Sequence, residues 1–281
     1  MIVPPGVVST PTFAFTDAQV PVQALNSLQP ARHDLRRGEW RRPGHSEGRD
    51  WRSALAKWDL SGLIQKWKAE QTEMRQRLVV RPLAPLPRFV AGADAAYSAD
   101  KKTVLAAAVV YDRQERQIVE VVHAVRPVEY PYIPTFLSFR EGPAVLQAIR
   151  SLKHEFGVIC FDGQGYAHPR RCGFASHMSI VLDVPGVGVA KSRLLGTYDE
   201  PAPEAGSSSP LMDKGEQIGL VLRTRDRVNP LFISIGHRVD LPSATALVMA
   251  CCTNYRVPEP TRQADIEVAR LKRQTAGAAA D

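Results

Sequence analysis

The sequence predicts an α/β fold in which helices flank a mixed β-sheet. Three β-like runs rich in valine and alanine follow one another between residues 89 and 125, separated by the short polar segments DKK and DRQER. Connections of this length suit hairpins, so we expect this part to form an antiparallel meander. Shorter apolar runs then alternate with helical patterns, an order typical of a mixed sheet with helices packed on it.

Each element follows from its own local pattern. The strands are expected at 89–97, 103–111, 117–125, 157–161, 187–190, 218–223 and 231–235. Helices are expected at 139–156, 243–252 and 261–273, and His177 falls in a further helix. In the first of these helices one apolar face is formed at helical spacing by Val145, Leu146, Ile149 and Leu152.

The N-terminal part of the chain differs from the rest. Residues 1–50 contain scattered prolines among polar and arginine-rich segments and have no sustained apolar period, which predicts a flexible arm. Two interpretations of its arginines stay open: a solvated tail, or an arm that binds phosphates without sequence specificity.

A helix is expected between this arm and the first strand. Residues 51–77 contain no proline, and apolar side chains recur there at helical spacing: Leu60, Leu63, Ile64, Trp67 and Met74. We expect this helix to be amphipathic and to break near Ser61 and Gly62. Residues 51–281 are then predicted to form one domain, with its core at 88–273.

The overall composition is that of a folded protein. The chain has 281 residues, of which 44% are hydrophobic and 23% are charged, close to the averages of globular domains and unlike collagen-like, coiled-coil or disordered chains. Its net charge of +7 permits a polyanionic partner such as a nucleic acid without requiring one.

The cysteines and the hydropathy pattern bear on the cellular location. The four cysteines form no CxxC pair and no regular framework, so the sequence indicates neither a zinc cluster nor a disulfide scaffold. No apolar run approaches the roughly 20 residues that cross a bilayer, and the N-terminus lacks a signal-peptide pattern. We therefore expect a cytoplasmic protein without membrane contact, and, since no coiled-coil repeat is present, a monomer.

Three acidic residues occupy positions at which a metal site is plausible. Asp94 lies inside the first expected strand, in FVAGADAAY, and Asp162 ends the strand VICF just before GQG. Glu141 lies in the first turn of a helix, where an acid also favours the helix dipole. Each residue alone is more often structural than catalytic. Together they indicate a site for Mg²⁺, which prefers oxygen ligands, and hence metal-assisted phosphodiester chemistry.

The segment that follows Asp162 is dense in glycine, histidine and arginine. Gly165 would let the backbone approach a ligand closely. His168 could contact phosphate or transfer a proton, or could be a surface histidine in a proline turn. Lys191, after the apolar run GVGVA, could project towards the same site or be a solvated lysine.

A proline-flanked turn offers a candidate nucleic-acid contact. Pro131, Tyr132, Ile133 and Pro134 form a rigid turn that presents an aromatic and a β-branched side chain. Such an apolar wedge can enter between bases and unstack them. The alternative, a stiff loop whose tyrosine packs on its own domain, is equally compatible with the sequence.

Six segments taken together resemble the endonuclease V family, inosine-directed nucleases with a ribonuclease H-like fold. The resemblance covers residues 60–272 with the order and spacing preserved, which makes it far more specific than any single motif. The matching segments are GADAAY (92–97), PYIPTFLSFRE (131–141), FDGQGYAHPRRCGFASH (161–177), VGVAKSRLLGTY (187–198), EQIGLVLRTRDRVNPLFISIGHR (216–238) and YRVPEPTRQAD (255–265).

The resemblance implies an activity and a set of site residues. The activity is hydrolysis of the second phosphodiester bond 3′ to a deaminated base, chiefly inosine, in DNA repair, with Mg²⁺ or Mn²⁺ as cofactor. The implied metal ligands are Asp94, Glu141, Asp162 and Asp265. Tyr132 matches the wedge tyrosine, while His168 and Lys191 match residues near the scissile phosphate. The implied base pocket comprises Thr135, Leu137, Gly165, Gly173, Phe174, Ala190 and Leu194.

This chain departs from the family pattern at three positions, and two other functions stay open. Thr135 stands where the family usually has glycine, Phe174 replaces a smaller aliphatic residue, and Ser179 replaces a glycine. Because the carboxylates are intact, hydrolysis is better supported than strict inosine selectivity. The alternatives are a ribonuclease that cleaves inosine-containing RNA, and a nucleic-acid-binding protein that does not cut.

Overall fold

The structure is a computed structural model that describes residues 60–277. The expected arm at 1–50 and the first part of the expected helix, 51–59, lie outside the described residues.

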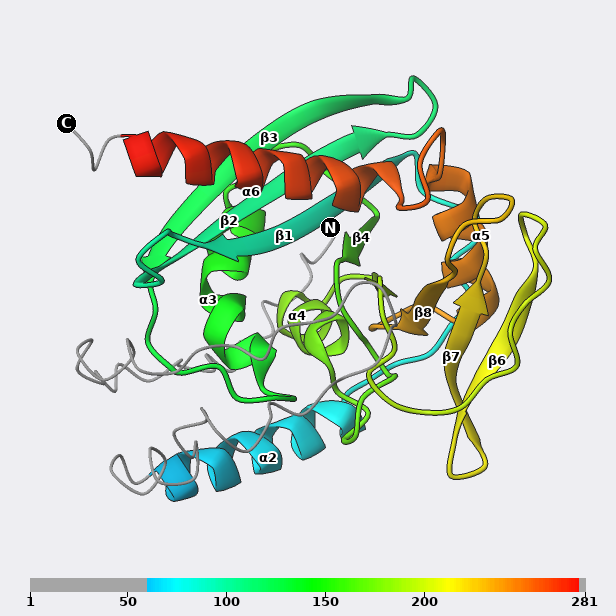
Figure 1. The fold of residues 1–281 in the computed structure, drawn as a ribbon, viewed down its shortest axis with the longest axis horizontal. Coiled ribbons are helices and arrows are strands. Elements are labelled where there is room, and N and C mark those ends of the chain that lie inside the picture. The colour runs from blue at the N-terminus through cyan, green and yellow to red at the C-terminus, as the bar shows by residue number, and fades with distance from the viewer. Residues whose placement is uncertain (1–59, 278–281) are drawn as a thin grey trace, which may run out of the picture.

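One eight-stranded mixed sheet organises the described chain (Figure 1), and the α/β prediction is confirmed. Its strands lie in the order β3-β2-β1-β4-β5-β8-β7-β6. The central strands β1, β4 and β5 are parallel, whereas β2 and β3 on one side and β8, β7 and β6 on the other pair antiparallel. The strands are β1 (Phe89–Tyr97), β2 (Thr103–Asp112), β3 (Gln117–Pro127), β4 (Val158–Phe161), β5 (Gly186–Ala190), β6 (Ser208–Asp213), β7 (Glu216–Leu222) and β8 (Leu231–Ile235).

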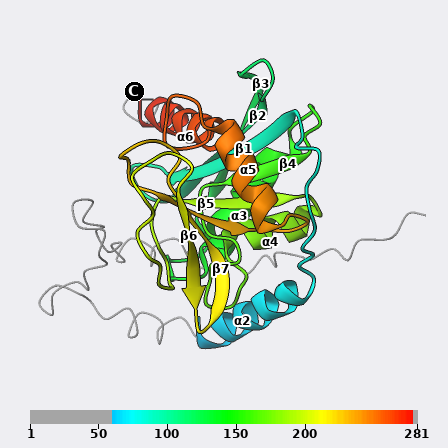
Figure 2. The ribbon, with the colours of Figure 1, turned by 90° about the vertical axis from the view of Figure 1, so that its right-hand side faces the viewer.

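Helices cover both faces of this sheet (Figures 1 and 2). The helices that cover the sheet are α3 (Leu137–Arg150), α4 (Phe174–Leu182), α5 (Leu241–Cys251) and α6 (Glu259–Gly277), while α2 (Leu60–Gln76) packs against α4. Residues of α3 and α4 share an apolar core with Ala91 and Phe161, and residues of α5 share one with Val90 and Cys160. Successive strand residues point to opposite faces, so these two cores lie on opposite sides of the sheet. Helix α6 packs on β1 and β2.

One expectation about an individual element was wrong, and another cannot be judged within the described residues. Ser61 and Gly62 lie in the first turn of α2, which begins at Leu60, so a break of the expected helix at this point would involve residues 51–59, outside the described residues. The helix expected at 139–156 ends at Arg150, and the apolar pattern misled because Leu152 and Phe156 pack against the core after the backbone has left the helix.

Strand β6 was not expected from the sequence at all. It contains Pro210 and forms the edge of the sheet, where a residue without an N–H group is tolerated. Its pairing with β7 is a tertiary feature that the local sequence does not reveal.

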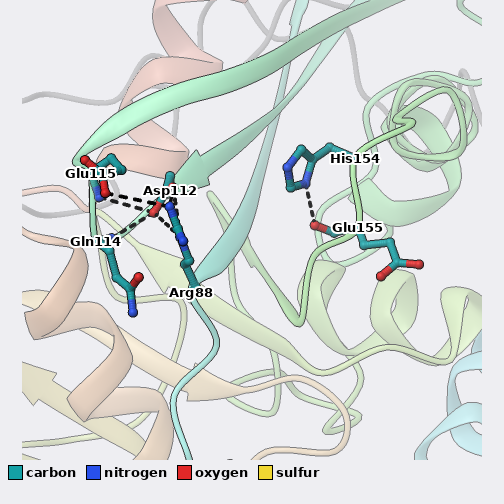
Figure 3. Close-up of polar contacts among 6 residues, drawn as sticks. All are labelled: Arg88, Asp112, Gln114, Glu115, His154 and Glu155. Carbon is teal, nitrogen blue, oxygen red and sulfur yellow. Dashed lines mark hydrogen bonds and ion pairs between the residues drawn. The ribbon is translucent and has the colours of Figure 1, made fainter.

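An ion pair fixes the start of β1 against the end of β2 (Figure 3). The Arg88 guanidinium donates to both carboxylate oxygens of Asp112 at 2.6–3.0 Å. The Asp112 Oδ1 also accepts from the backbone N–H groups of Gln114 and Glu115. Hydrogen bonding from Arg88, the largest cause, lowers the pKa of Asp112 to about 2. The pair therefore anchors the strand that carries Asp94.

None of the helices within residues 60–277 is both long enough and apolar enough to cross a lipid bilayer.

Candidate active site

The register of the sheet brings Asp94 and Asp162 side by side. Strands β1 and β4 are parallel, with Ala93 opposite Phe161. Asp94 directly follows Ala93 within β1, and Asp162 directly follows Phe161 at the end of β4. Because side chains alternate along a strand, both aspartates are on the same face as Val90 and Cys160, whose side chains face α5. The predicted proximity of these two carboxylates is therefore present.

Glu141 reaches the same end of the sheet from helix α3. Its Oε1 accepts a hydrogen bond of 2.7 Å from the hydroxyl of Tyr97, the last residue of β1. The guanidinium of the preceding residue, Arg140, lies 4.5 Å from the centroid of the Tyr97 ring. The charge of Asp162 acts on Glu141, which places the two carboxylates in one electrostatic environment.

Lys191 and Asp265 complete the cluster. The Lys191 Nζ, one residue beyond β5, lies 2.6 Å from Asp162 Oδ2 and 3.5 Å from Asp265 Oδ2. Asp265 is on α6, which approaches β1 closely because Gly92 has no side chain: a Cβ there would lie 2.2 Å from the backbone of Pro260. One glycine thus allows a helix-borne carboxylate to reach the strand-borne ones.

Burial and mutual repulsion disfavour the charged form of the carboxylates in this cluster. Burial, followed by the charge of Asp162, raises the pKa of Asp94 to about 8. Burial also raises the pKa of Glu141 to about 7, although the Tyr97 hydrogen bond opposes the shift. Carboxylates arranged in this way are destabilising unless a cation accompanies them.

The donor set fits a hard divalent cation. All four candidate ligands offer carboxylate oxygens, which Mg²⁺ and Mn²⁺ prefer over nitrogen or sulfur. Within residues 60–277, no three His, Cys, Asp or Glu side chains are already gathered as a ready-made metal site. The Lys191 ammonium instead contacts Asp162 and Asp265, and Glu141 is engaged by Tyr97.

His168 lies close to the wedge turn rather than against the carboxylates. It is 2% exposed, its Nδ1 accepts from the Arg170 N–H at 3.3 Å, and its Nε2 lies 3.0 Å from the Thr135 carbonyl. Burial, with the charge of Arg170, lowers the pKa of His168 to about 4. The ring is therefore neutral at pH 7, and, since Nδ1 accepts, its proton is on Nε2 and is donated to Thr135.

His168 should make the stability of the protein depend on pH. Because the pKa of the folded state lies below the ordinary value of 6.5, the stabilisation is complete above pH 6.5 and is lost as the pH falls towards 4. The shift corresponds to about 3 kcal/mol in the free energy of unfolding. Urea unfolding of wild type and His168→Gln between pH 7 and 4 measures it. Identical pH profiles of the two proteins would contradict this assignment.

The wedge turn has one partly exposed and one anchored side chain. Tyr132 is 40% exposed, and Ile133 packs against the cluster of Trp67, Tyr130, Phe136 and Phe139. The sequence left two interpretations open, an apolar wedge and a stiff loop packed on its own domain. The structure has features of each, because the turn packs on the protein through Ile133 while Tyr132 is partly exposed.

The seven residues of the expected base pocket lie in different surroundings. Leu137 and Phe174 pack in the core with α3 and α4, and Ala190 packs in a separate cluster with Phe232. Leu194 is 37% exposed. Gly165 and Gly173 bind each other through a backbone hydrogen bond of 2.9 Å, and Thr135 contacts His168. The pocket remains a prediction for these residues.

Sequence reasoning assigned no role to three residues that the structure places at the site. Tyr97 binds Glu141, and Arg140 stacks on Tyr97. Burial lowers the pKa of Arg256, and the charge of Asp162 acts on this guanidinium. All three lie within the segments that carry the family resemblance, or beside a predicted ligand, but only tertiary contacts reveal their partners.

The sequence model of the Endonuclease V family matches residues 72–266. The chain belongs to the endonuclease V family. Endonuclease V of Rippkaea orientalis is 44% identical over 202 residues, which are 72% of this chain and 88% of that protein. Endonuclease V of a Roseiflexus species is 46% identical over 198 residues, 70% of this chain and 88% of that protein. Membership in this family makes the chain a nuclease.

Solved endonuclease V structures share the fold. The Streptomyces avermitilis protein is 40% identical with a TM-score of 0.72, over 75% of this chain and 94% of that one. The catalytic domain of human endonuclease V is 33% identical, also with a TM-score of 0.72, over 77% and 98%. The Ciona intestinalis protein, solved with a 23mer DNA containing an inosine followed by a ribo-adenosine, is 25% identical with a TM-score of 0.67, over 76% and 98%. These matches confirm the predicted family and fold.

Proposed function

We propose that this nuclease acts in DNA repair, recognising inosine in DNA and hydrolysing the second phosphodiester bond 3′ to it with Mg²⁺ or Mn²⁺ as cofactor. The observation that carries the proposal is the pair of neighbouring carboxylates Asp94 and Asp162 at one end of the sheet, with Glu141 close enough to feel the charge of Asp162 and with raised pKa values at Asp94 and Glu141. The inosine-containing DNA bound by the Ciona relative supports the choice of substrate.

The carboxylates have the chemistry for a metal-assisted mechanism. Asp94, Asp162 and Glu141 would hold the cation, with Asp265 as a more exposed fourth ligand. A divalent ion, when bound, polarises the phosphate and lowers the pKa of an attacking water. Lys191 contributes an ammonium at the same edge, where it stabilises negative charge on the phosphate.

The wedge supplies access to the base. Hypoxanthine must leave the base stack before its edge can be read, and a mispaired base is the least costly to extrude. The exposed Tyr132 on the anchored turn has the shape for insertion between bases. His168, which is buried and hydrogen-bonded to the Thr135 carbonyl, supports the turn from the side of the segment that follows Asp162.

RNA is the second candidate substrate. The Ciona relative was solved with a DNA that contains a ribo-adenosine after the inosine, so a member of this family binds a strand that carries at least one 2′-hydroxyl. A preference for RNA would require use of that group at the cut site.

Cleavage of matched end-labelled oligonucleotides tests the proposal. DNA and RNA strands, each with one inosine or none, are incubated with the full chain in Mg²⁺, in Mn²⁺ and in EDTA. We expect a single cut at the second bond 3′ to inosine in DNA, none without metal, and none in inosine-free strands. A stronger cut in RNA would move the function to RNA, and retained binding with no cut in either would support the non-cleaving alternative.

A further inference from the structure

We propose that Gln71 and Arg170 are positioning residues that hold Thr135 in a strained backbone conformation and thereby aim the wedge, residues 131–134, at the base stack. This inference rests on the proposed function and concerns how that function reaches a base inside a duplex. We call the set of Gln71, Thr135, His168 and Arg170 the Thr135 clamp.

The backbone of Thr135 is strained. Its φ is +72°, in the left-handed region where a β-branched side chain is a genuine outlier. Glycine, which has no Cβ, would take this conformation freely. A strained residue persists only where its surroundings enforce it, and such residues concentrate at functional sites.

The surroundings of Thr135 do enforce it. Its carbonyl oxygen accepts from Gln71 Nε2 at 3.1 Å, from His168 Nε2 at 3.0 Å and from the Arg170 guanidinium at 3.0 Å. The Thr135 Oγ1 accepts a further 2.7 Å hydrogen bond from Arg170. Three donors on one carbonyl exceed its two lone pairs, so this atom is held from several sides at once.

Gln71 is the centre of these contacts. Its Oε1 accepts from Arg170 Nε at 2.5 Å, and its Nε2 also donates to the Cys172 carbonyl at 3.2 Å. The side chain therefore links the Thr135 turn to the segment that follows Asp162. Gln71 is 1% exposed and lies just before the stretch matched by the family model, residues 72–266.

Helix α2 supplies a second, apolar anchor to the same turn. Trp67, one turn before Gln71, stacks on Phe139 at 4.6 Å and meets Tyr130 edge-on at 4.9 Å. Arg170 in turn lies 4.4 Å from the centroid of Phe136. Contacts therefore hold the chain on both sides of the wedge, at Tyr130 and at residues 135–136, while Tyr132 between them is partly exposed. The turn therefore has fixed ends and a partly exposed tyrosine between them.

A rigid base is needed only where a base must be forced out of a stack. In a duplex, insertion of the wedge works against stacking and pairing. In a single strand the base is already accessible. The clamp should therefore affect cleavage of duplex DNA and leave single-strand cleavage nearly unchanged, a difference that a purely structural role does not produce.

The test compares wild type with Gln71→Met, which keeps the size of the side chain and removes its hydrogen bonds. The same inosine strand is offered alone and as a duplex. We expect kcat/KM to fall about 10- to 100-fold on the duplex and to change less than about twofold on the single strand. In a Thr135→Gly background the effect of Gln71→Met should shrink, because glycine reaches a positive φ without enforcement.

A second measurement does not depend on cleavage. In an Asp162→Asn background, a duplex with 2-aminopurine beside the inosine should brighten on binding as the stack opens, and Gln71→Met should reduce this signal. Gln71→Glu, which keeps the acceptor for Arg170, should lie between the two proteins. Thr72→Ala, on the exposed side of α2, is the matched control and should leave both readouts unchanged.

The outcomes separate the clamp from the proposed function. Equal losses on both substrates, no loss on either, or unchanged 2-aminopurine brightening would each overturn the clamp while wild-type cutting stands. If wild type cuts neither inosine substrate, the proposed function fails and the clamp fails with it.

Discussion

Asp94→Asn is expected to lower the rate of cleavage by about 10³-fold or more without lowering the stability of the metal-free protein. The side chain is the strand-borne ligand beside Asp162, and its pKa of about 8 reflects burial and the neighbouring charge. An amide of the same size replaces the charged ligand with a weaker, neutral one and removes the electrostatic penalty. Loss of activity and retention of stability are the combination expected for a residue kept for function.

The stability difference should also depend on pH in a defined direction. Because the folded-state pKa of Asp94 is raised above 3.8, the wild-type fold loses stability as the pH rises from about 4 towards 8. The variant lacks this loss, so its advantage should be larger at pH 8 than at pH 5. Single-turnover cleavage and urea unfolding measure the two effects.

Glu73→Gln provides the matched control for this variant. Glu73 is an exposed carboxylate on α2, so its replacement should leave both cleavage and stability unchanged. Substantial residual cleavage by Asp94→Asn, or a marked loss of stability, would show that Asp94 is a structural residue.

Gly165→Ala is expected to lower the free energy of unfolding by more than about 3 kcal/mol. A Cβ at this position would lie 2.1 Å from the carbonyl oxygen and 2.8 Å from the carbonyl carbon of Ile235. Both contacts are to backbone, which cannot rotate away as a side chain can. Gly165 also accepts from Gly173 N–H and donates to Ser234 Oγ, so the segment cannot shift without breaking these bonds.

Gly62→Ala is the matched glycine control. Nothing lies within 4 Å of a Cβ built at Gly62, and the residue is in the first turn of α2. Alanine there should raise stability by up to about 1 kcal/mol. Urea unfolding of the two variants beside wild type makes the comparison. Equal effects in both would refute the argument from close backbone approach.

Gly165 also has a packing role that the sequence did not indicate. The sequence offered Gly165 as a position for close approach to a ligand, which stays a prediction, and the structure shows that Gly165 also lies close to the backbone of β8. This second contact was not expected, because the sheet order that places β8 beside β5 is set by pairing distant in sequence.

Prediction from the sequence succeeded where the signal is local. The strands β1 and β8 have the expected bounds, since each is a short apolar run whose length fits a strand. Prediction failed at β6 and at the end of α3, where the local sequence pattern does not match the structure that tertiary contacts impose. Proline in an edge strand and apolar residues after a helix both satisfy the fold without following the usual pattern.

The sequence by itself determined that the chain is an α/β nuclease of the endonuclease V family and which carboxylates to examine, because residue type and order are carried in the chain. Only the tertiary structure decided that Lys191 joins Asp162 to Asp265 and that His168 is buried against Thr135. The same holds for Gln71, 64 residues before Thr135 in the chain. Contacts over such separations depend on how helices pack on the sheet, and no local spacing encodes that packing.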